Sequence, residues 1–215
     1  MSKRYKTAVL ISGSGTNLQA LIDAQGEDFP ADISLVLSNR AEAYGLERAK
    51  AAGLSIKIIS HKDYPSREAF DSAMQKALTE AGIEFICLAG FMRILSDAFV
   101  DAWSGRMVNI HPSLLPAFKG HNAHAQVLAY SVALSGCSVH AVTRDLDGGP
   151  IIGQAAVPRW AEDDETALAA RVREAEHLLY PLAVKAFLRE GDALPAFTAP
   201  PDMVLSLNSR VRVTA

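Results

Sequence analysis

"TAVLISGSGTNLQALIDA", residues 7–24, contains the pattern from which we predict the fold of this chain. Its first six residues form an apolar, β-branched run, which is typical of a strand buried on both faces of a parallel sheet. Glycines end the run, and the residues after them carry apolar side chains at helical spacing. A buried strand that turns directly into a helix favours an α/β domain.

The same alternation of strand-like and helical segments continues along the chain. We expect further strands, each buried on both faces, over residues 33–38, 55–60, 85–90 and 107–110. Helical patterns cover residues 43–53, 66–82 and 96–103. This alternation predicts a doubly wound, mostly parallel sheet.

The pattern changes after residue 135. Residues 137–158 contain two strand-like runs joined by an Asp-Gly-Gly turn, which indicates an antiparallel C-terminal addition to the sheet. A final helix is expected over about residues 164–190, with a kink at Pro181. Residues 192–215 are predicted to form a tail that is either an edge strand or disordered.

The composition limits the class of protein. With 215 residues, of which 49% are hydrophobic and 21% charged, the chain can bury the core of one large domain, which we place over residues 1–191. The net charge of -3 argues against a nucleic-acid partner, and no segment is long enough to span a membrane. The two cysteines lie far apart in apolar contexts, as buried thiols do in a reducing compartment, so we expect a cytoplasmic protein with a small-molecule partner.

Three places carry candidate chemistry, and the first is the glycine-rich loop over residues 13–17. Glycines let the backbone N–H groups of such a turn point outward, and the following helix adds partial positive charge, so the loop suits an anion such as phosphate. It is not a dinucleotide fingerprint, because the third glycine of that motif would fall at Leu18. An ordinary turn capped by Thr16 or Asn17 is the alternative.

The second place is "MVNIHPSLLPAFKG", residues 107–120. Asn109 and His111 end a predicted strand, and the ligands of open α/β sheets bind outside the carboxyl ends of the strands. Residues two apart on a strand face the same way, and Pro112 and Pro116 would restrict the loop that follows. The pair is either catalytic or a structural hydrogen-bonding pair.

The third place is "RDLDGGP", residues 144–150, in which Asp147 precedes two glycines. By itself this motif is explained by the turn chemistry of a hairpin. The three places together, however, supply a carboxylate, an imidazole, an amide donor and a phosphate-binding loop. Acyl transfer to a phosphorylated amine requires these groups.

Several segments carry a resemblance to a known family, namely "LISGSGTNLQALIDA", "SNRAEAYGLERA", "LAGFMRILS", "NIHPSLLPAFKG" and "DLDGGPII". From about residue 6 to about residue 190, the chain resembles the glycinamide ribonucleotide formyltransferases, the folate-dependent transformylases of purine biosynthesis. "NIHPSLLP" is shared with other 10-formyltetrahydrofolate enzymes, whereas "SGSGTNLQ" narrows the resemblance to the ribonucleotide enzymes. The resemblance implies a Rossmann-like formyltransferase fold with a phosphate-binding N-terminal half and a folate-binding C-terminal half.

Carried over residue by residue, the resemblance implies a set of roles. The catalytic residues are Asn109, His111 and Asp147. The substrate's phosphate is bound by Gly15, Thr16, Asn17 and Arg67, and its amine and ribose by Glu176 and Arg173. Folate is bound by Met92, Arg93, Ile94, Leu95, Val100, Val142, Arg144 and Asp147. Because Arg173 and Glu176 stand three apart on one helix, an ordinary ion pair is the alternative for them.

The implied reaction transfers a formyl group from one small molecule to another. The glycyl amine of glycinamide ribonucleotide attacks the formyl carbon of the co-substrate 10-formyltetrahydrofolate, with no covalent enzyme intermediate and no metal. Asn109 and His111 would donate hydrogen bonds to the developing oxyanion, and His111 or a water held by Asp147 would relay the proton. The alternatives are a formyltetrahydrofolate hydrolase and a non-catalytic phosphate-ligand sensor on the same fold. We expect a monomer or a homodimer.

Two features depart from the family's pattern. Gly153 stands where a larger apolar residue is usual, so we expect looser packing of that strand. His121 and His124, with Asn122 between them, lie in a segment that varies within the family. We expect His124 either to orient the folate loop or to cap a helix.

Overall fold

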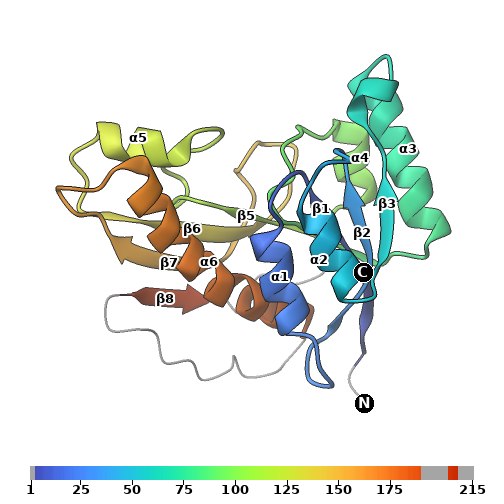
Figure 1. Cartoon of the computed structure of the whole chain (residues 1–215), viewed down its shortest axis with the longest axis horizontal. Helices are drawn as coiled ribbons and strands as arrows, with labels where there is room; N and C mark the ends of the chain where they lie inside the picture. Colours follow the sequence, from blue (N-terminus) through green and yellow to red (C-terminus); the bar gives the residue numbers. More distant parts are fainter. Residues whose placement is uncertain (1–2, 190–202, 208–215) are drawn as a thin grey trace. The chain divides into compact units, whose positions relative to one another are not determined.

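The computed structural model describes residues 3–189 and 203–207, and these residues form two compact units (Figure 1). The first unit ends at Asn109 and the second begins at Ile110, so the boundary falls inside strand β5 (Met107–His111). A single domain over residues 1–191 stays a prediction. Most of the expected tail, residues 192–202 and 208–215, lies outside the described residues.

Parallel strands that alternate with helices make up the first unit. Its strands are β1 (Tyr5–Ile11), β2 (Ala31–Ser38), β3 (Ser55–Ile58), β4 (Phe85–Leu88) and β5, hydrogen-bonded in the order β3-β2-β1-β4-β5. Its helices are α1 (Thr16–Asp23), α2 (Gly45–Ala51), η1 (His61–Asp63), α3 (Arg67–Glu80) and α4 (Asp97–Ala102). All strand pairs recorded in this unit are parallel, which confirms the predicted class of sheet. In Figure 1, α1 lies beside α2 and α3 beside α4.

The core of the first unit lies where the apolar runs were predicted. Residues 8–11 of β1 are fully buried, and β4 is buried along its whole length. Helix α3 buries Phe70, Met74 and Leu78, which stand four residues apart and therefore share one face. The helix begins where Ser66 Oγ accepts a hydrogen bond from the N–H group of Ala69.

Strand β3 departs from the prediction. A strand over residues 55–60, buried on both faces, was expected, but β3 ends at Ile58 and its side chains are mostly exposed. Among the described strands β3 pairs with β2 alone, so it forms an edge of the sheet. The prediction of burial was wrong because an apolar run does not reveal whether a strand is central or at the edge.

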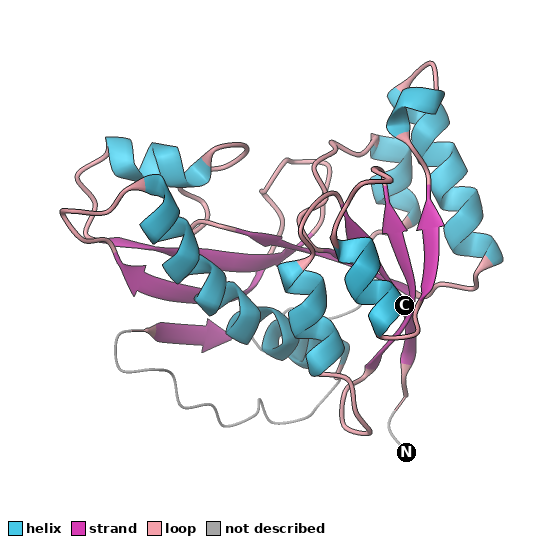
Figure 2. Cartoon of the chain, in the orientation of Figure 1, coloured by secondary structure: helices cyan, strands magenta, loops and turns pink. Residues whose placement is uncertain are grey.

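The last three strands of the second unit pair in antiparallel fashion. Beyond the end of β5 this unit contains α5 (Ala123–Ala129), β6 (Leu134–Ala141), β7 (Ile151–Pro158), α6 (Glu165–Leu188) and β8 (Val204–Leu207). β7 pairs in antiparallel fashion with β6 on one side and β8 on the other, which confirms the predicted C-terminal addition. Figure 2 shows α6 running along β6 and β7, and α6 supplies much of this unit's core. The helix continues through Pro181, and the kink expected there stays a prediction.

The packing around Gly153 is close, whereas we expected it to be loose. A Cβ atom at this position of β7 would lie 2.7 Å from Leu207 Cδ2 and 3.0 Å from Leu179 Cδ1. The missing side chain therefore makes room for β8 and α6 to approach the strand. The sequence reasoning also missed the short helix α5.

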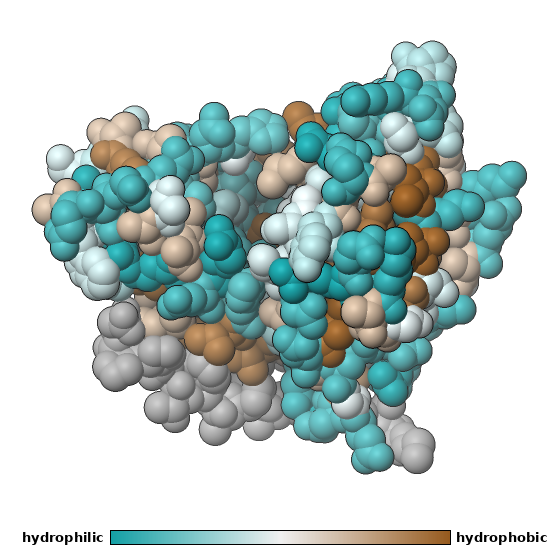
Figure 3. All heavy atoms as spheres, viewed as in Figure 1, coloured by the Kyte–Doolittle hydropathy of each residue, from teal (hydrophilic) through white to brown (hydrophobic). Residues whose placement is uncertain are grey.

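The face of the molecule drawn in Figure 3 is mostly polar. Figure 3 shows hydrophilic side chains over most of the visible face, with hydrophobic ones in smaller patches. None of the helices in the described part of the chain combines the length and the hydropathy needed to cross a bilayer.

Candidate active site

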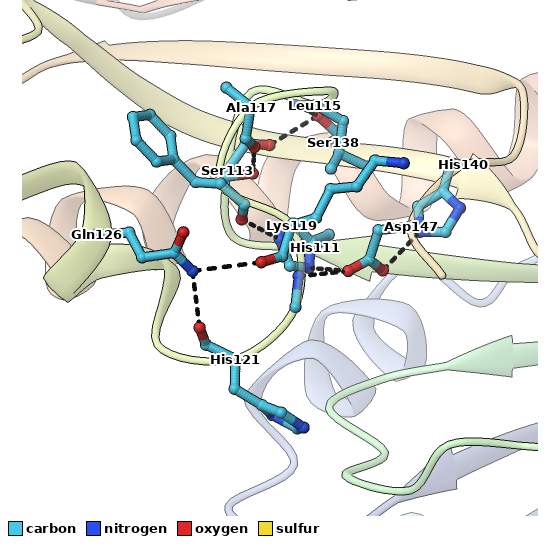
Figure 4. A network of polar contacts seen from close by, with 12 residues as sticks. His111, Ser113, Leu115, Ala117, Lys119, His121, Gln126, Ser138, His140 and Asp147 are labelled. Carbon is cyan, nitrogen blue, oxygen red and sulfur yellow. Dashed lines mark hydrogen bonds and ion pairs between the residues drawn. The ribbon is translucent and has the colours of Figure 1, made fainter. Parts of the chain in front are cut away.

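The imidazole of His111, at the end of β5, is held between a backbone carbonyl and a carboxylate (Figure 4). Its Nε2 lies 2.9 Å from the carbonyl oxygen of Phe118, and its Nδ1 lies 3.4 Å from Asp147 Oδ2. Because a carbonyl oxygen only accepts hydrogen bonds, His111 Nε2 carries a proton and donates the hydrogen bond to Phe118 O. The loop after β5 thus folds back onto the ring and fixes its orientation.

Asp147 lies in the loop between β6 and β7, with its side chain only 7% exposed. Its φ of 49° is in the left-handed region, a conformation that aspartate tolerates better than most residues. Oδ2 accepts a hydrogen bond of 2.8 Å from the N–H group of Gly120, and Oδ1 lies 3.5 Å from His140 Nε2. The carboxylate is therefore placed between the His111 and His140 imidazoles, as Figure 4 shows.

The surroundings of Asp147 keep it ionised. Burial alone would raise the pKa of its carboxyl group, but the hydrogen bonds from His140 and Gly120 and the nearby His111 imidazole lower that pKa to about 2. A carboxylate with this pKa carries its negative charge throughout the neutral range. It can therefore hold a proton donor or an ordered water in place.

The sequence reasoning missed His140. This residue lies on β6 with only 2% of its surface exposed, and its Nδ1 is 3.0 Å from the carbonyl oxygen of Ala141. The signal was a histidine inside the apolar run "CSVHAV", in a strand that leads into the Asp147 loop. That signal became specific only once the β6–β7 pairing placed the ring beside the carboxylate.

Asn109 belongs to the first unit, where it pairs with Leu88 of β4. It is half-buried and stands two positions before His111 on β5. Side chains at such positions leave a strand on the same face, as the sequence predicted.

The glycine-rich loop differs from the expected capped turn. Helix α1 begins after Gly15, whose φ of 70° lies in the left-handed region, and within the described residues no side chain caps the helix. The interpretation in which Thr16 or Asn17 caps the turn was therefore wrong. An N-terminus without a side-chain cap leaves its N–H dipoles directed at whatever binds there.

Helix α2 packs directly against this loop. A Cβ atom on Gly15 would lie 2.5 Å from the Cα atom of Gly45, and the N–H group of Gly45 donates a hydrogen bond to Gly13 O at 3.0 Å. Arg48 Nε donates a second hydrogen bond to Ser14 O, also at 3.0 Å. Gly45 and Arg48 thus support the loop, although neither was singled out from the sequence.

The other predicted ligand contacts of the first unit differ in exposure. Met92 and Ile94 are 58% and 51% exposed, although both side chains are large and apolar, and exposed apolar side chains often mark a ligand surface. Val100 is buried in α4. Arg67 is exposed at the start of α3, where its Nε lies 3.4 Å from Glu68 Oε1.

The remaining predicted residues lie in the second unit. In the β6–β7 loop Val142 is half-buried and Arg144 is exposed. On α6, Arg173 is exposed whereas Glu176 is 8% exposed. Burial and the negative charge of Glu176 both raise the pKa of the Cys137 thiol. Cys87 and Cys137 are both buried thiols, as predicted.

His124 lies within α5 rather than at its cap, where Asn122 stands. Burial lowers the pKa of the His124 imidazole, an effect to which nearby Arg173 and His111 also contribute. Within the ranges that the structure covers, no cluster of His, Cys, Asp or Glu side chains is arranged to hold a metal ion.

Comparisons with known proteins point to one family. The formyl transferase family model matches residues 5–184. The chain is 51% identical to the human trifunctional purine biosynthetic protein adenosine-3 over 85% of its own length, but it spans only 18% of that relative. It is 47% identical to the phosphoribosylglycinamide formyltransferase of Escherichia coli, over 83% of this chain and 85% of that enzyme.

Solved structures show the same likeness. The chain is similar to glycinamide ribonucleotide transformylase 1 of Symbiobacterium toebii, with a TM-score of 0.84 and 44% identity over 89% of this chain and 93% of that one. The phosphoribosylglycinamide formyltransferase of Brucella melitensis gives a TM-score of 0.81 and 48% identity, over 85% of this chain and 95% of that one.

Proposed function

The chain belongs to the formyl transferase family, and we propose from this membership that it transfers the formyl group of 10-formyltetrahydrofolate to the glycyl amine of glycinamide ribonucleotide, a step of purine biosynthesis. The likeness to named phosphoribosylglycinamide formyltransferases supports this choice of substrate. The observation that carries the proposal is the buried contact between the imidazole of His111 and the ionised carboxylate of Asp147.

The reaction needs donors for an oxyanion and a route for one proton. The amine attacks the formyl carbon, a C–N bond forms, and negative charge develops on the formyl oxygen. Asn109 and His111 are proposed to donate hydrogen bonds to this oxygen. When the carbon–nitrogen bond to the folate breaks, the proton lost by the amine passes to the folate nitrogen through His111 or a water on Asp147.

One contact restricts how His111 acts. Its Nε2 donates to the carbonyl oxygen of Phe118, while its Nδ1 faces Asp147. Donation from Nε2 to the formyl oxygen therefore requires the hydrogen bond to Phe118 to be exchanged for one to the substrate. We propose that substrate binding makes this exchange.

The substrate phosphate is proposed to bind at the N-terminus of α1, through Gly15, Thr16 and Asn17, with Arg67 as a cationic partner. The absence of a side-chain cap on α1 among the described residues and the left-handed Gly15 support this assignment. Arg173 and Glu176 are proposed to contact the amine and ribose, and Glu176 would do so from a buried position.

In the first unit, folate is proposed to bind the exposed apolar side chains of Met92 and Ile94 and the neighbouring residues Arg93, Leu95 and Val100. In the second unit, the residues proposed for folate are Val142, Arg144 and Asp147. The exposure of Met92 and Ile94 supports this choice, since a pterin ring offers an apolar face. We propose a cytoplasmic monomer or homodimer that uses these two small molecules and no metal.

The test is an absorbance assay of folate release from 10-formyltetrahydrofolate, run with and without glycinamide ribonucleotide. We expect release only when the ribonucleotide is present. Equal release without the ribonucleotide would identify a hydrolase. Binding of the ribonucleotide with no release in either arm would identify a sensor.

A further inference from the structure

A buried hydroxyl group joins two chain segments that lie 80 residues apart. Ser12, 4% exposed, stands at the end of β1 directly before the glycine-rich loop. Its Oγ accepts a hydrogen bond of 2.8 Å from the N–H group of Met92, which lies 80 residues further along the chain. The same Oγ donates a hydrogen bond of 2.6 Å to Asn39 Oδ1.

Asn39 fixes the direction of these hydrogen bonds. It follows β2 directly and is 1% exposed, and its Nδ2 lies 3.2 Å from His61 Nδ1. An amide nitrogen can only donate, so His61 Nδ1 accepts, and Asn39 Oδ1 is left to accept from Ser12. Each group in the series from Met92 to His61 therefore has a defined role as donor or acceptor.

The segment from Gly90 to Leu95 depends on few anchors. It has no regular secondary structure, and the side chains of Met92 and Ile94 point into solvent. Its backbone is held at Met92 by Ser12 and, just beyond its end, at the N–H group of Ser96 by Asp71 Oδ2 at 2.6 Å. Loss of the first anchor would leave the N–H group of Met92 without its acceptor.

We propose that Ser12 and Asn39 are positioning residues that hold the phosphate loop, residues 13–17, and the folate segment, residues 90–95, as one body. The names of the two ligands rest on the proposed function, but the linkage itself rests on the hydrogen bonds of Ser12. Because the two segments share one hydroxyl group, a ligand that orders one of them also restricts the other. Neither Ser12 nor Asn39 needs to touch a substrate for this.

The first test needs no ligand and no activity. Amide hydrogen exchange of the full chain is measured for the unmodified protein, Ser12→Ala and Asn39→Ala. We expect Ser12→Ala to accelerate exchange at the Met92 amide by about tenfold, the effect of losing one hydrogen bond. The matched control is Ser34→Ala, which removes a buried hydroxyl that has no hydrogen-bond partner among the described residues. An unchanged Met92 amide in Ser12→Ala would overturn the proposal.

The variant Asn39→Asp should restore the hydrogen bond from Ser12 that Asn39→Ala removes. It keeps an oxygen that can accept from Ser12 but loses the N–H group that faces His61. We expect exchange at the Met92 amide to return toward that of the unmodified protein, whereas Asn39→Ala stays fast. Equal exchange in the two variants would contradict the role that we assign to the Ser12–Asn39 hydrogen bond.

The second test separates positioning from a purely structural role. In steady-state assays we expect Ser12→Ala to raise the KM for both substrates several-fold, with a smaller fall in kcat. A structural role would lower the folded fraction, and so the apparent kcat, at unchanged KM. A rise in only one of the two KM values would also contradict the shared anchor. If the unmodified protein shows no ribonucleotide-dependent release, the proposed function fails, and the exchange data still decide the linkage.

Discussion

At the scale of single residues, the negative charge of the Asp147 carboxylate is the feature on which we expect activity to depend most. Asp147→Asn keeps the size of the side chain and an oxygen for the N–H group of Gly120, but it removes the negative charge between the two imidazoles. We expect kcat to fall by about 10²-fold or more, the range for lost acid–base groups, while the protein stays folded. Turnover and thermal unfolding measured together check this.

The control lies in the same loop. Asp145, 75% exposed, forms an ion pair with Lys119 at 3.5 Å, and exposed pairs of this kind contribute little. Asp145→Asn should therefore keep nearly full activity. If the two variants lost activity equally, the loop as a whole rather than the Asp147 carboxylate would be responsible.

Gly15 is constrained both by its backbone and by its neighbour. A Cβ atom here would lie 2.5 Å from Gly45 Cα, and the φ of 70° disfavours any side chain. We expect Gly15→Ala to lower the free energy of unfolding by about 1–3 kcal/mol and to raise the KM for the ribonucleotide. Urea unfolding and substrate titration measure the two effects. Gly26→Ala, where no described atom lies within 4 Å of the new Cβ, should cost far less.

At the scale of elements, strand β8 depends on the bare backbone of Gly153. A valine at this position would collide with Leu207 on β8 and with Leu179 on α6. We expect Gly153→Val to accelerate amide exchange over β8 while the amides shared by β6 and β7 stay protected. Ala156→Val, on the opposite face of β7, is the control. Unchanged protection of β8 in Gly153→Val would show that the strand tolerates the extra volume.

The guanidinium group of Arg171 stabilises the connection between β7 and α6. Arg171 donates two hydrogen bonds to the carboxylate of Asp163, at 2.7 and 2.8 Å, and a third to Pro158 O at 2.9 Å. Its guanidinium carbon also lies 3.6 Å from the centre of the Trp160 ring. Lysine cannot reproduce this planar, forked geometry.

We therefore expect Arg171→Lys to lower the free energy of unfolding by about 1–2 kcal/mol, measured by urea denaturation. Arg4→Lys is the comparison, because Arg4 makes a single exposed contact of 3.2 Å with Asp32. Equal stability of the two variants would contradict a special role for the guanidinium fork.

At the scale of the whole molecule, stability should fall in acid. The pKa of Asp147 is lowered from 3.8 to about 2. The pKa of Asp163 is lowered by the same amount, mainly because Arg171 donates hydrogen bonds to its carboxylate. A lowered pKa means that the folded state favours the ionised form, so this stability is present above about pH 4 and is lost as the pH falls to about 2. Asp71 acts in the opposite direction, because burial raises the pKa of its carboxyl group.

Urea denaturation at a series of pH values between 6 and 2 would follow this loss. We expect a smaller decrease in Asp147→Asn, because the neutral amide has no proton to take up. Asp71→Asn should leave the acid-induced decrease in place. A pH profile of Asp147→Asn identical to that of the unmodified protein would contradict the low pKa of Asp147.

Local patterns in the chain were enough to predict the class of fold and part of the candidate site. Apolar runs and helical spacing are local patterns, so they located the parallel strands of the first unit, the antiparallel pair of the second and the long final helix. The resemblance to the formyltransferases pointed to His111 and Asp147, which lie together in the structure. Their catalytic roles stay predictions.

The neighbours of each element became known only from the folded structure. It placed β3 at an edge, brought β8 against Gly153, set Gly45 beside Gly15 and put His140 next to Asp147. The Ser12 hydroxyl bonds to partners 27 and 80 residues away. No window of sequence contains such contacts, because they exist only when the order of strands in the sheet brings distant side chains within hydrogen-bonding or van der Waals distance.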